Sequence, residues 1–94
     1  MSDKPVHVPV DGILDLHAFR PGEVLSVVDE YLRACREAGL LQVRIIHGKG
    51  KGVQRNAVRE FLKKQHFVVS VRGAEETGGG WGATIVNMLP PGES

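Results

Sequence analysis

The sequence contains little cysteine, no long apolar run and almost no net charge, and each of these absences excludes a class of protein. The one cysteine, Cys35, excludes a disulfide within the chain and fits a reducing cytosol, so we expect a cytoplasmic protein. No apolar run approaches the roughly 20 residues that a membrane helix needs. Residues 1–5 are not followed by the apolar region of a signal peptide. We therefore expect no membrane partner.

The net charge of +1 points to no particular partner, but the charges are unevenly distributed. Between residues 42 and 72 the only acid is Glu60, and most of the other acids lie toward the N-terminus. The basic residues of this segment are Arg44, Lys49, Lys51, Arg55, Arg59, Lys63, Lys64 and Arg72. Such a segment can be the footprint of a polyanion or a solvated helix face. We favour the polyanion for the two lysines that neighbour glycines, whereas Arg59, Lys63 and Lys64 fit both interpretations.

The apolar pattern predicts one domain with the element order β-α-β-α-β-β. A chain of 94 residues has room for one modest core. Strand patterns cover residues 10–17, 42–47, 67–72 and 82–88, and helical patterns cover residues 21–38 and 53–65. We expect a flexible arm over residues 1–9, the domain over 10–89 and a flexible tail over 90–94.

Each predicted element has an apolar side that should face the core. In the first strand Leu14 and Leu16 point one way, opposite to Ile13, Asp15 and His17. The first helix should bury Val24, Leu25, Val27, Val28, Tyr31, Leu32, Cys35 and Ala38, and Gly39 should end it. The second helix should bury Val53, Ala57, Val58, Phe61 and Leu62. The fourth strand is apolar on both sides apart from Thr84 and Asn87, which is typical of a central strand.

Glycine and lysine alternate in the glycine–lysine loop (Gly48–Gly52), which lies between the second strand and the second helix. A strand, a glycine-rich turn and a helix N-terminus together present backbone N–H groups to an anion. The loop is not a nucleoside-triphosphate P-loop, because it lacks the G-x-x-x-x-G-K-[ST] spacing. The residues that we predict to contact phosphate are Gly48, Lys49, Gly50, Lys51, Gly52 and Arg55.

The predicted element order brings four separate segments to one edge of the sheet. Right-handed crossovers make the first three strands parallel and place both helices on one face. These strands then end at the edge where the antiparallel fourth strand begins. Asp15 and His17 should therefore meet His47, the glycine–lysine loop and the segment Gly78–Gly82. Ligands of open α/β sheets commonly bind at this edge.

Three motifs resemble the Smr (small MutS-related) domain family. They are Leu14-Asp15-Leu16-His17, Ile46-His47-Gly48-Lys49-Gly50 and Gly79-Gly80-Trp81-Gly82-Ala83-Thr84-Ile85-Val86. The likeness runs over about residues 11–88. It implies a two-layer α/β sandwich similar to the C-terminal domain of translation initiation factor 3, with the fourth strand between the second and third. The chain would be a stand-alone member, without the ATPase or ribosome-recruiting domains of larger relatives.

The resemblance also implies an activity and a set of site residues. Family members bind nucleic acid, and many are endonucleases that nick DNA or cut RNA, including messenger RNA on stalled ribosomes. The family's aspartate–leucine–histidine motif corresponds to Asp15 and His17, and its histidine–glycine–x–glycine motif begins at His47. Ala18 replaces the glycine that usually follows the first histidine. If the backbone there required a positive φ, alanine would be penalised and catalysis would suffer.

These residues suit phosphodiester cleavage, which needs a base, an acid and positive groups for the developing charge. Histidines titrate near neutral pH, so His17 and His47 could serve as base and acid while Asp15 orients one ring. On RNA the 2′-hydroxyl is the nucleophile, so no cofactor is required. A divalent metal held by the same three side chains is the alternative, but magnesium prefers oxygen ligands, and we favour the metal-free path.

Two functions remain open at this point. One is a small endonuclease that acts on RNA or DNA. The other is a binding module with a silent site that docks on a ribosome or a DNA-repair complex. Gly80 and Trp81 belong to the site in both cases, where Trp81 could stack on a base or instead cap the core. Neither the preference for RNA or DNA nor the oligomeric state follows from the sequence.

Overall fold

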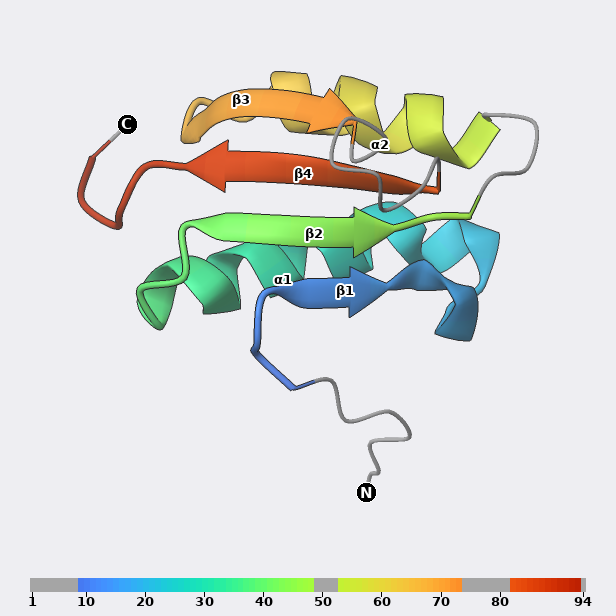
Figure 1. Ribbon diagram of the computed structural model, residues 1–94, viewed down its shortest axis with the longest axis horizontal. Coiled ribbons are helices and arrows are strands. Elements are labelled where there is room, and N and C mark those ends of the chain that lie inside the picture. The colour runs from blue at the N-terminus through green and yellow to red at the C-terminus, as the bar shows by residue number, and fades with distance from the viewer. Residues whose placement is uncertain (1–8, 49–52, 74–81, 94) are drawn as a thin grey trace.

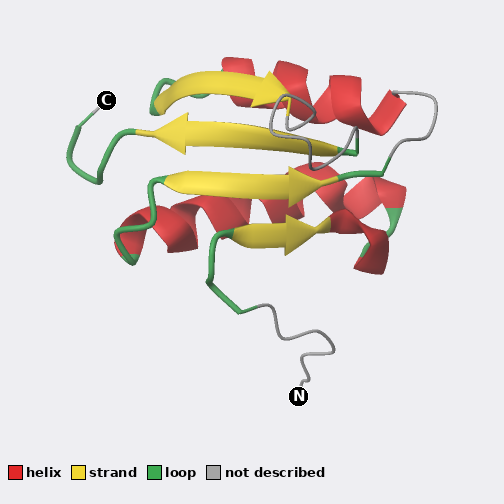
Figure 2. Ribbon diagram, viewed as in Figure 1, coloured by secondary structure: helices red, strands yellow, loops and turns green. Residues whose placement is uncertain are grey.

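The fold has two layers, a four-stranded sheet and a pair of helices on one of its faces (Figures 1 and 2). The computed structural model describes residues 9–48, 53–73 and 82–93. The strands are β1 (Ile13–Asp15), β2 (Gln42–Ile46), β3 (Val68–Gly73) and β4 (Ala83–Met88). The helices are α1 (Val24–Glu37) and α2 (Val53–Lys63), and the 3-10 turns Leu16–Ala18 and Pro21–Glu23 lie between β1 and α1.

The strand order across the sheet is β1-β2-β4-β3. Strand β1 pairs with β2 in parallel, and β4 pairs with both β2 and β3 in antiparallel fashion. The prediction of three parallel strands and a central, antiparallel fourth strand is therefore confirmed. Because both crossovers carry a helix to the same face, α1 and α2 contact each other behind the sheet (Figure 1).

The core lies between the helices and the sheet, and most of its members are the predicted ones. Leu14 and Leu16 are buried, while Ile13, Asp15 and His17 are exposed, so the alternation along the first segment is confirmed. The core residues are Leu14, Leu16, Val24, Val28, Tyr31, Leu32, Cys35, Val43, Ile45, Val58, Leu62, Phe67, Val86 and Met88. Burial raises the pKa of the Cys35 thiol, which fits its position within the core.

Four apolar residues of the helices are exposed instead of buried, which corrects the predicted stripes. Leu25 and Val53 are 39% and 74% exposed, and Ala38 and Ala57 are exposed as well. Leu25, Val53 and Ala57 line a shallow hollow between the N-terminal parts of the two helices, on the flank of each helix that does not face the sheet. Ala38 is the C-cap of α1, where the chain already turns away from the core.

The first strand is shorter than predicted, and its shortening places His17 in a turn. The sequence pattern suggested a strand over residues 10–17, whereas β1 pairs with β2 only over Ile13–Asp15. The Asp15 carboxylate accepts a hydrogen bond from the His17 backbone N–H and thereby caps the 3-10 turn Leu16–Ala18. A capping aspartate ends the strand here, because the side chain offers the backbone N–H a partner outside the sheet.

Gly39 ends helix α1 as predicted. Its φ of +82° places it in the left-handed region, where glycine carries no Cβ penalty. The Leu40 N–H donates to the Cys35 carbonyl at 2.8 Å, and the Gly39 N–H donates to the Arg36 carbonyl at 3.0 Å. These are the two hydrogen bonds of a Schellman motif, which satisfies the last carbonyls of the helix.

Within the described ranges, no helix has the length and apolar character to cross a membrane.

Candidate active site

Asp15 and His17 form a hydrogen-bonded pair at the carboxyl end of β1. Asp15 Oδ1 lies 2.7 Å from His17 Nδ1 and 2.9 Å from the His17 backbone nitrogen. Both side chains face solvent, with 58% of the Asp15 side chain and 66% of the His17 side chain exposed. The backbone N–H of His17, followed by its ring, lowers the pKa of Asp15. The carboxylate therefore stays ionised at neutral pH.

This pairing fixes the orientation of the His17 ring. An ionised carboxylate can only accept, so Nδ1 carries the hydrogen and Nε2 is left as an acceptor in the neutral ring. Nε2 faces Gly48, where a Cβ added to the glycine would lie 3.0 Å from Nε2 and 3.6 Å from Cε1. Gly48 also has a φ of +84°. Glycine at this position therefore allows the left-handed backbone conformation and leaves space beside His17 Nε2.

His47 lies on the other side of Gly48 and is buried, with 7% exposure. Its Nε2 lies 2.8 Å from Thr84 Oγ1, and its Nδ1 lies 3.0 Å from the Gly48 carbonyl oxygen. The backbone N–H groups of His47 and Gly48 both donate to the Gly82 carbonyl, at 2.8 and 2.9 Å. Gly82 thus joins β4 to the end of β2 at the predicted edge of the sheet.

Two residues that the sequence did not identify as site residues, Thr84 and Arg59, complete this cluster. Thr84 is fully buried in β4, and its Oγ1 accepts a hydrogen bond from Arg59 Nε on α2 at 3.0 Å. Arg59 Nη2 is also buried and has no hydrogen-bond partner among the residues that the structure describes. Thr84 was visible in the sequence as one of two polar residues in an apolar strand, which is a signal for a buried polar partner.

The structure brings Asp15, His17, His47 and Gly48 together from β1 and β2, and Gly82 joins them from the segment before β4. Arg55 lies on the first turn of α2 and is half-buried. The remaining predicted site residues, which lie outside the described residues, are Lys49, Gly50, Lys51, Gly52, Gly80 and Trp81.

Ala18 occupies the last position of the 3-10 turn after β1. In the part of the chain that the structure describes, every residue with a positive φ is a glycine. Ala18 therefore adopts a backbone conformation that alanine tolerates, and the replacement of glycine carries no left-handed penalty here. The expected reason for Ala18 to impair catalysis was a positive φ at this position, and Ala18 has none.

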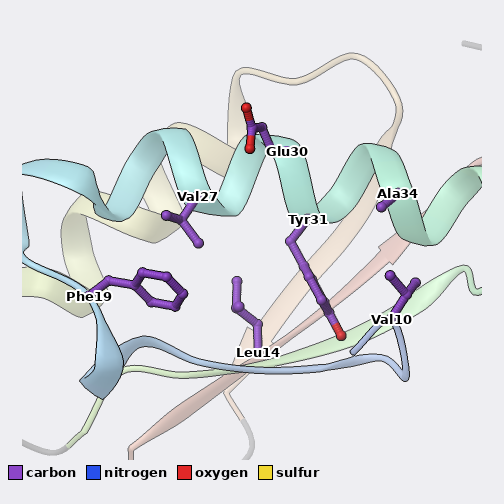
Figure 3. A pocket seen from close by; sticks show the side chains of 7 residues that line it. All are labelled: Val10, Leu14, Phe19, Val27, Glu30, Tyr31 and Ala34. Carbon is purple, nitrogen blue, oxygen red and sulfur yellow. The ribbon is translucent and has the colours of Figure 1, made fainter. Parts of the chain in front are cut away.

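Asp15 and His17 of the candidate site lie exposed at an edge of the sheet. A separate hollow of about 280 Å³ lies between α1 and β1, lined by Val10, Leu14, Phe19, Val27, Glu30, Tyr31 and Ala34 (Figure 3). None of its lining residues belongs to the site. Across residues 9–48, 53–73 and 82–93, no three His, Cys, Asp or Glu side chains form a group that could hold a metal ion. An exposed acid–histidine pair on an open edge can be reached by a long polymer.

Comparisons with known proteins identify the family. The sequence profile of the Smr domain matches residues 14–88. Endonuclease MutS2 of Lactobacillus gasseri is 48% identical over 75 residues, and Endonuclease MutS2 of Enterococcus faecalis is 47% identical over 75 residues. Each match covers 80% of this chain and 10% of the relative. The chain therefore spans about a tenth of the length of these curated relatives.

Solved structures agree with the sequence match. The crystal structure of the Smr domain of Thermus thermophilus MutS2 has a TM-score of 0.75 and 38% identity, covering 83% of this chain and 98% of that one. The crystal structure of YdaL, a stand-alone small MutS-related protein from Escherichia coli, has a TM-score of 0.68 and 29% identity. The match covers 85% of this chain and 66% of the YdaL chain.

The fold and the site define a small α/β domain with an acid–histidine pair beside a glycine turn. The chain belongs to the Smr domain family. The fold class and the family expected from the motifs are confirmed, whereas the likeness to translation initiation factor 3 stays a prediction.

Proposed function

We propose that this domain binds nucleic acid and cleaves its phosphodiester backbone, with Asp15 and His17 as the reacting pair. The observation that carries the proposal is the orientation of the His17 ring. Nδ1 is held by an ionised carboxylate, while Nε2 faces a residue without a side chain. An aspartate that orients a histidine in this way is a common arrangement for a general base. The name Endonuclease MutS2, carried by relatives that share this domain, supports the same chemistry.

On RNA the proposed reaction needs no external nucleophile. His17 Nε2 removes the proton of a 2′-hydroxyl, the 2′-oxygen attacks the neighbouring phosphorus, and the bond from phosphorus to the 5′-oxygen breaks. An acid protonates the leaving 5′-oxygen, so the products are a 2′,3′-cyclic phosphate and a 5′-hydroxyl. Asp15 holds the ring and stabilises the imidazolium that forms. Lys49 and the amides of the glycine–lysine loop would stabilise the additional phosphate charge.

The identity of the acid is a separate question. The pairing of His17 with His47 stays a prediction, and the partners of His47 bear on it. Both ring nitrogens of His47 lie within hydrogen-bond distance of protein oxygens, from Thr84 and Gly48. His47 could therefore donate a proton to the substrate only after releasing one of them. A role in supporting the site needs no such release.

The arginines of the sheet support binding of a polyanion over a wider surface. Arg44 on β2 and Arg72 on β3 both pair in register with Ile85 of the central strand β4. The three side chains share the face opposite the helices, because Val43, Ile45 and Val86 point into the core from the alternate positions. Asp15 lies on the same face of β1, as Ile13 pairs with Arg44. A nucleic-acid strand on this face would lead to His17.

Product-end analysis tests the proposal. A defined RNA and the matching DNA are incubated with the domain, with and without a chelator, and the ends of the products are identified. We expect RNA cleavage that survives chelation, leaves a 2′,3′-cyclic phosphate and is blocked by a 2′-deoxy substitution at the cut site. A reaction that is abolished by the chelator and leaves 5′-phosphates would contradict this mechanism and favour metal-activated water.

A binding module with a silent site, docked on a ribosome or a repair complex, is the alternative function. Binding of the RNA or DNA without cleavage of either would support it. Ala18 does not favour this alternative, because the backbone at that position requires no glycine. The exposed and oriented His17 ring is the feature that makes cleavage the better proposal.

A further inference from the structure

We propose that Thr84 and Arg59 are positioning residues of this site, which act through His47 to hold Gly48 in place beside the His17 ring. This inference rests on the proposed function. The two residues come from β4 and α2, and neither touches Asp15 or His17 in the hydrogen bonds of the site. Their effect on the reacting pair must therefore pass through His47 and Gly48.

The contacts form one continuous chain from the helix layer to the reacting pair. Arg59 Nε donates to Thr84 Oγ1 at 3.0 Å, and Thr84 Oγ1 lies 2.8 Å from His47 Nε2. His47 Nδ1 lies 3.0 Å from the Gly48 carbonyl oxygen. Gly48 neighbours the His17 ring, because a Cβ built on this glycine would lie 3.0 Å from His17 Nε2. Residues of α2, β4 and the segment after β2 are therefore joined by hydrogen bonds beside the His17 ring.

The hydrogens of this chain can be assigned from donor and acceptor chemistry. The Gly48 carbonyl can only accept, so His47 Nδ1 carries a hydrogen. In the neutral ring Nε2 then accepts from the Thr84 hydroxyl, whose oxygen accepts from Arg59.

These hydrogen bonds fix the backbone of Gly48, which as a glycine has little intrinsic preference for one conformation. Gly48 adopts a φ of +84°, while its N–H donates to the Gly82 carbonyl at 2.9 Å and its carbonyl meets His47. Loss of the Thr84 hydroxyl would leave His47 Nε2 without this partner and favour the other tautomer, which cannot donate to the Gly48 carbonyl. The Gly48 carbonyl would then be free to rotate next to His17 Nε2.

The unfavourable burial of the Arg59 guanidinium supports a functional reason for the presence of an arginine at this position. Within residues 9–48, 53–73 and 82–93, Arg59 Nη2 is buried without a hydrogen-bond partner. Buried donors without partners are rare and unfavourable in native proteins. A simple apolar residue on α2 would avoid this cost but could not donate to Thr84. Local departures of this kind are expected where a side chain serves a site.

The test compares Thr84→Val, which keeps the shape without the hydroxyl, with Thr84→Ser, which keeps the hydroxyl. Ser26→Ala is the matched control, because it removes an exposed hydroxyl of helix α1, away from the open face, where Ser26 Oγ donates to the Glu23 carbonyl at 3.1 Å. The first readout is the tautomer of each imidazole from nitrogen-15 NMR, with the exposed His66 as internal reference. The second readout is the single-turnover cleavage rate alongside the Kd of a 2′-deoxy analogue.

We expect Thr84→Val to shift His47 toward the Nε2–H tautomer and to lower the cleavage rate roughly tenfold to hundredfold. The Kd of the analogue should change little. Thr84→Ser should keep both readouts at the parent's values, and Ser26→Ala should alter neither. A folded Thr84→Val variant with the parent's His47 tautomer and cleavage rate would overturn the inference. Equal losses from Thr84→Val and Ser26→Ala would overturn it as well.

Two further outcomes keep the test decisive. If Thr84→Val does not fold, Arg59→Lys replaces it, since lysine keeps the charge but lacks the Nε–H that meets Thr84. Unchanged His47 signals in that variant would overturn the inference. If the parent domain cleaves nothing, the proposed function fails, while the His47 tautomer in the variants still decides whether the positioning chain exists.

Discussion

The hydrogen-bonded pair Asp15–His17 is the smallest unit of the proposed site. Neither residue is part of the core, and the pair depends on the two hydrogen bonds that Asp15 Oδ1 accepts. These hydrogen bonds lower the pKa of Asp15, so the carboxylate is more stable as an anion in the folded domain than in the unfolded chain. The pair thus links a property of the site to the pH dependence of folding.

Asp15→Asn should slow cleavage while binding persists, because the neutral amide cannot stabilise the imidazolium of His17. The substitution should also change stability in a pH-dependent way. A lowered pKa contributes stability above the ordinary aspartate value of 3.8, and the contribution is lost as the pH falls through the folded value. The difference in Tm between parent and variant should therefore shrink below about pH 4. Thermal unfolding from pH 7 to pH 3 and single-turnover cleavage measure the two effects; a variant that cleaves at the parent's rate contradicts the proposed role.

Gly48→Ala should impair both folding and cleavage. The left-handed φ of +84° costs an L-residue about 1–2 kcal/mol, and the new Cβ would lie 3.0 Å from His17 Nε2. Gly39→Ala is the matched control, because Gly39 has a φ of +82° but no atom within 4 Å of its added Cβ. Denaturant unfolding should give similar losses for the two variants, whereas only Gly48→Ala should lose cleavage. Retention of the parent's cleavage rate by Gly48→Ala would show that the space beside His17 is not needed.

At the scale of elements, the position of β1 depends on helix α1. Tyr31 of α1 is buried, and its hydroxyl accepts from the Gly12 N–H at 3.0 Å and the Asp11 N–H at 3.2 Å. The same hydroxyl lies 3.2 Å from the Ile13 carbonyl. Because β1 pairs with a neighbour on one side only, this contact with the helix fixes the segment that leads to Asp15 and His17.

Tyr31→Phe should destabilise the domain by about 1–3 kcal/mol, because it leaves the buried Gly12 N–H without an acceptor. The cleavage rate of the folded fraction should fall less than in Asp15→Asn, as the reacting pair itself is retained. Chemical denaturation gives the change in free energy. The C-terminal half of α1 offers a control in Arg33→Ala, which removes only an exposed contact to Asp29. Equal stabilities of Tyr31→Phe and the parent would contradict the role of the hydroxyl.

At the scale of the whole molecule, the open face of the sheet carries basic residues from two strands. Arg44 and Arg72 flank Ile85 on this face. Helix α1 on the opposite side carries three acidic residues and two arginines, which are Asp29, Glu30, Glu37, Arg33 and Arg36. An anionic polymer would meet favourable charge on the open face. The basic segment of the sequence thus contributes to one side of the sheet as well as to α2.

Replacing Arg44 and Arg72 by alanine should weaken nucleic-acid binding through lost phosphate contacts. Each lost contact should reduce the slope of log affinity against log salt by about 0.7–0.9. Arg33→Ala, on the outer face of α1, should leave the slope unchanged. Salt titrations with single-stranded and duplex ligands measure the slopes. A slope in the double variant equal to that of the parent would remove the open face from the binding surface.

The sequence was sufficient to predict the fold and the edge of the sheet at which the candidate residues meet. Alternating and helical apolar patterns identified all strands and helices of the described residues, with ends that differ by a few residues. Right-handed crossovers then left one arrangement for the first three strands, so the convergence of Asp15, His17, His47 and Gly48 followed from element order alone. The motifs were specific enough to identify the Smr family from the sequence.

Tertiary structure decided which side chains face each other across elements. The burial of His47, its contact with Thr84 and the donation from Arg59 join three elements that are distant in sequence, and no local pattern encodes such partners. The exposure of Val53 depends likewise on where α2 lies relative to α1. Periodicity determines which face of an element is apolar, because that follows from local geometry. The partner of a polar side chain depends on how several elements pack, so only the folded chain determines it.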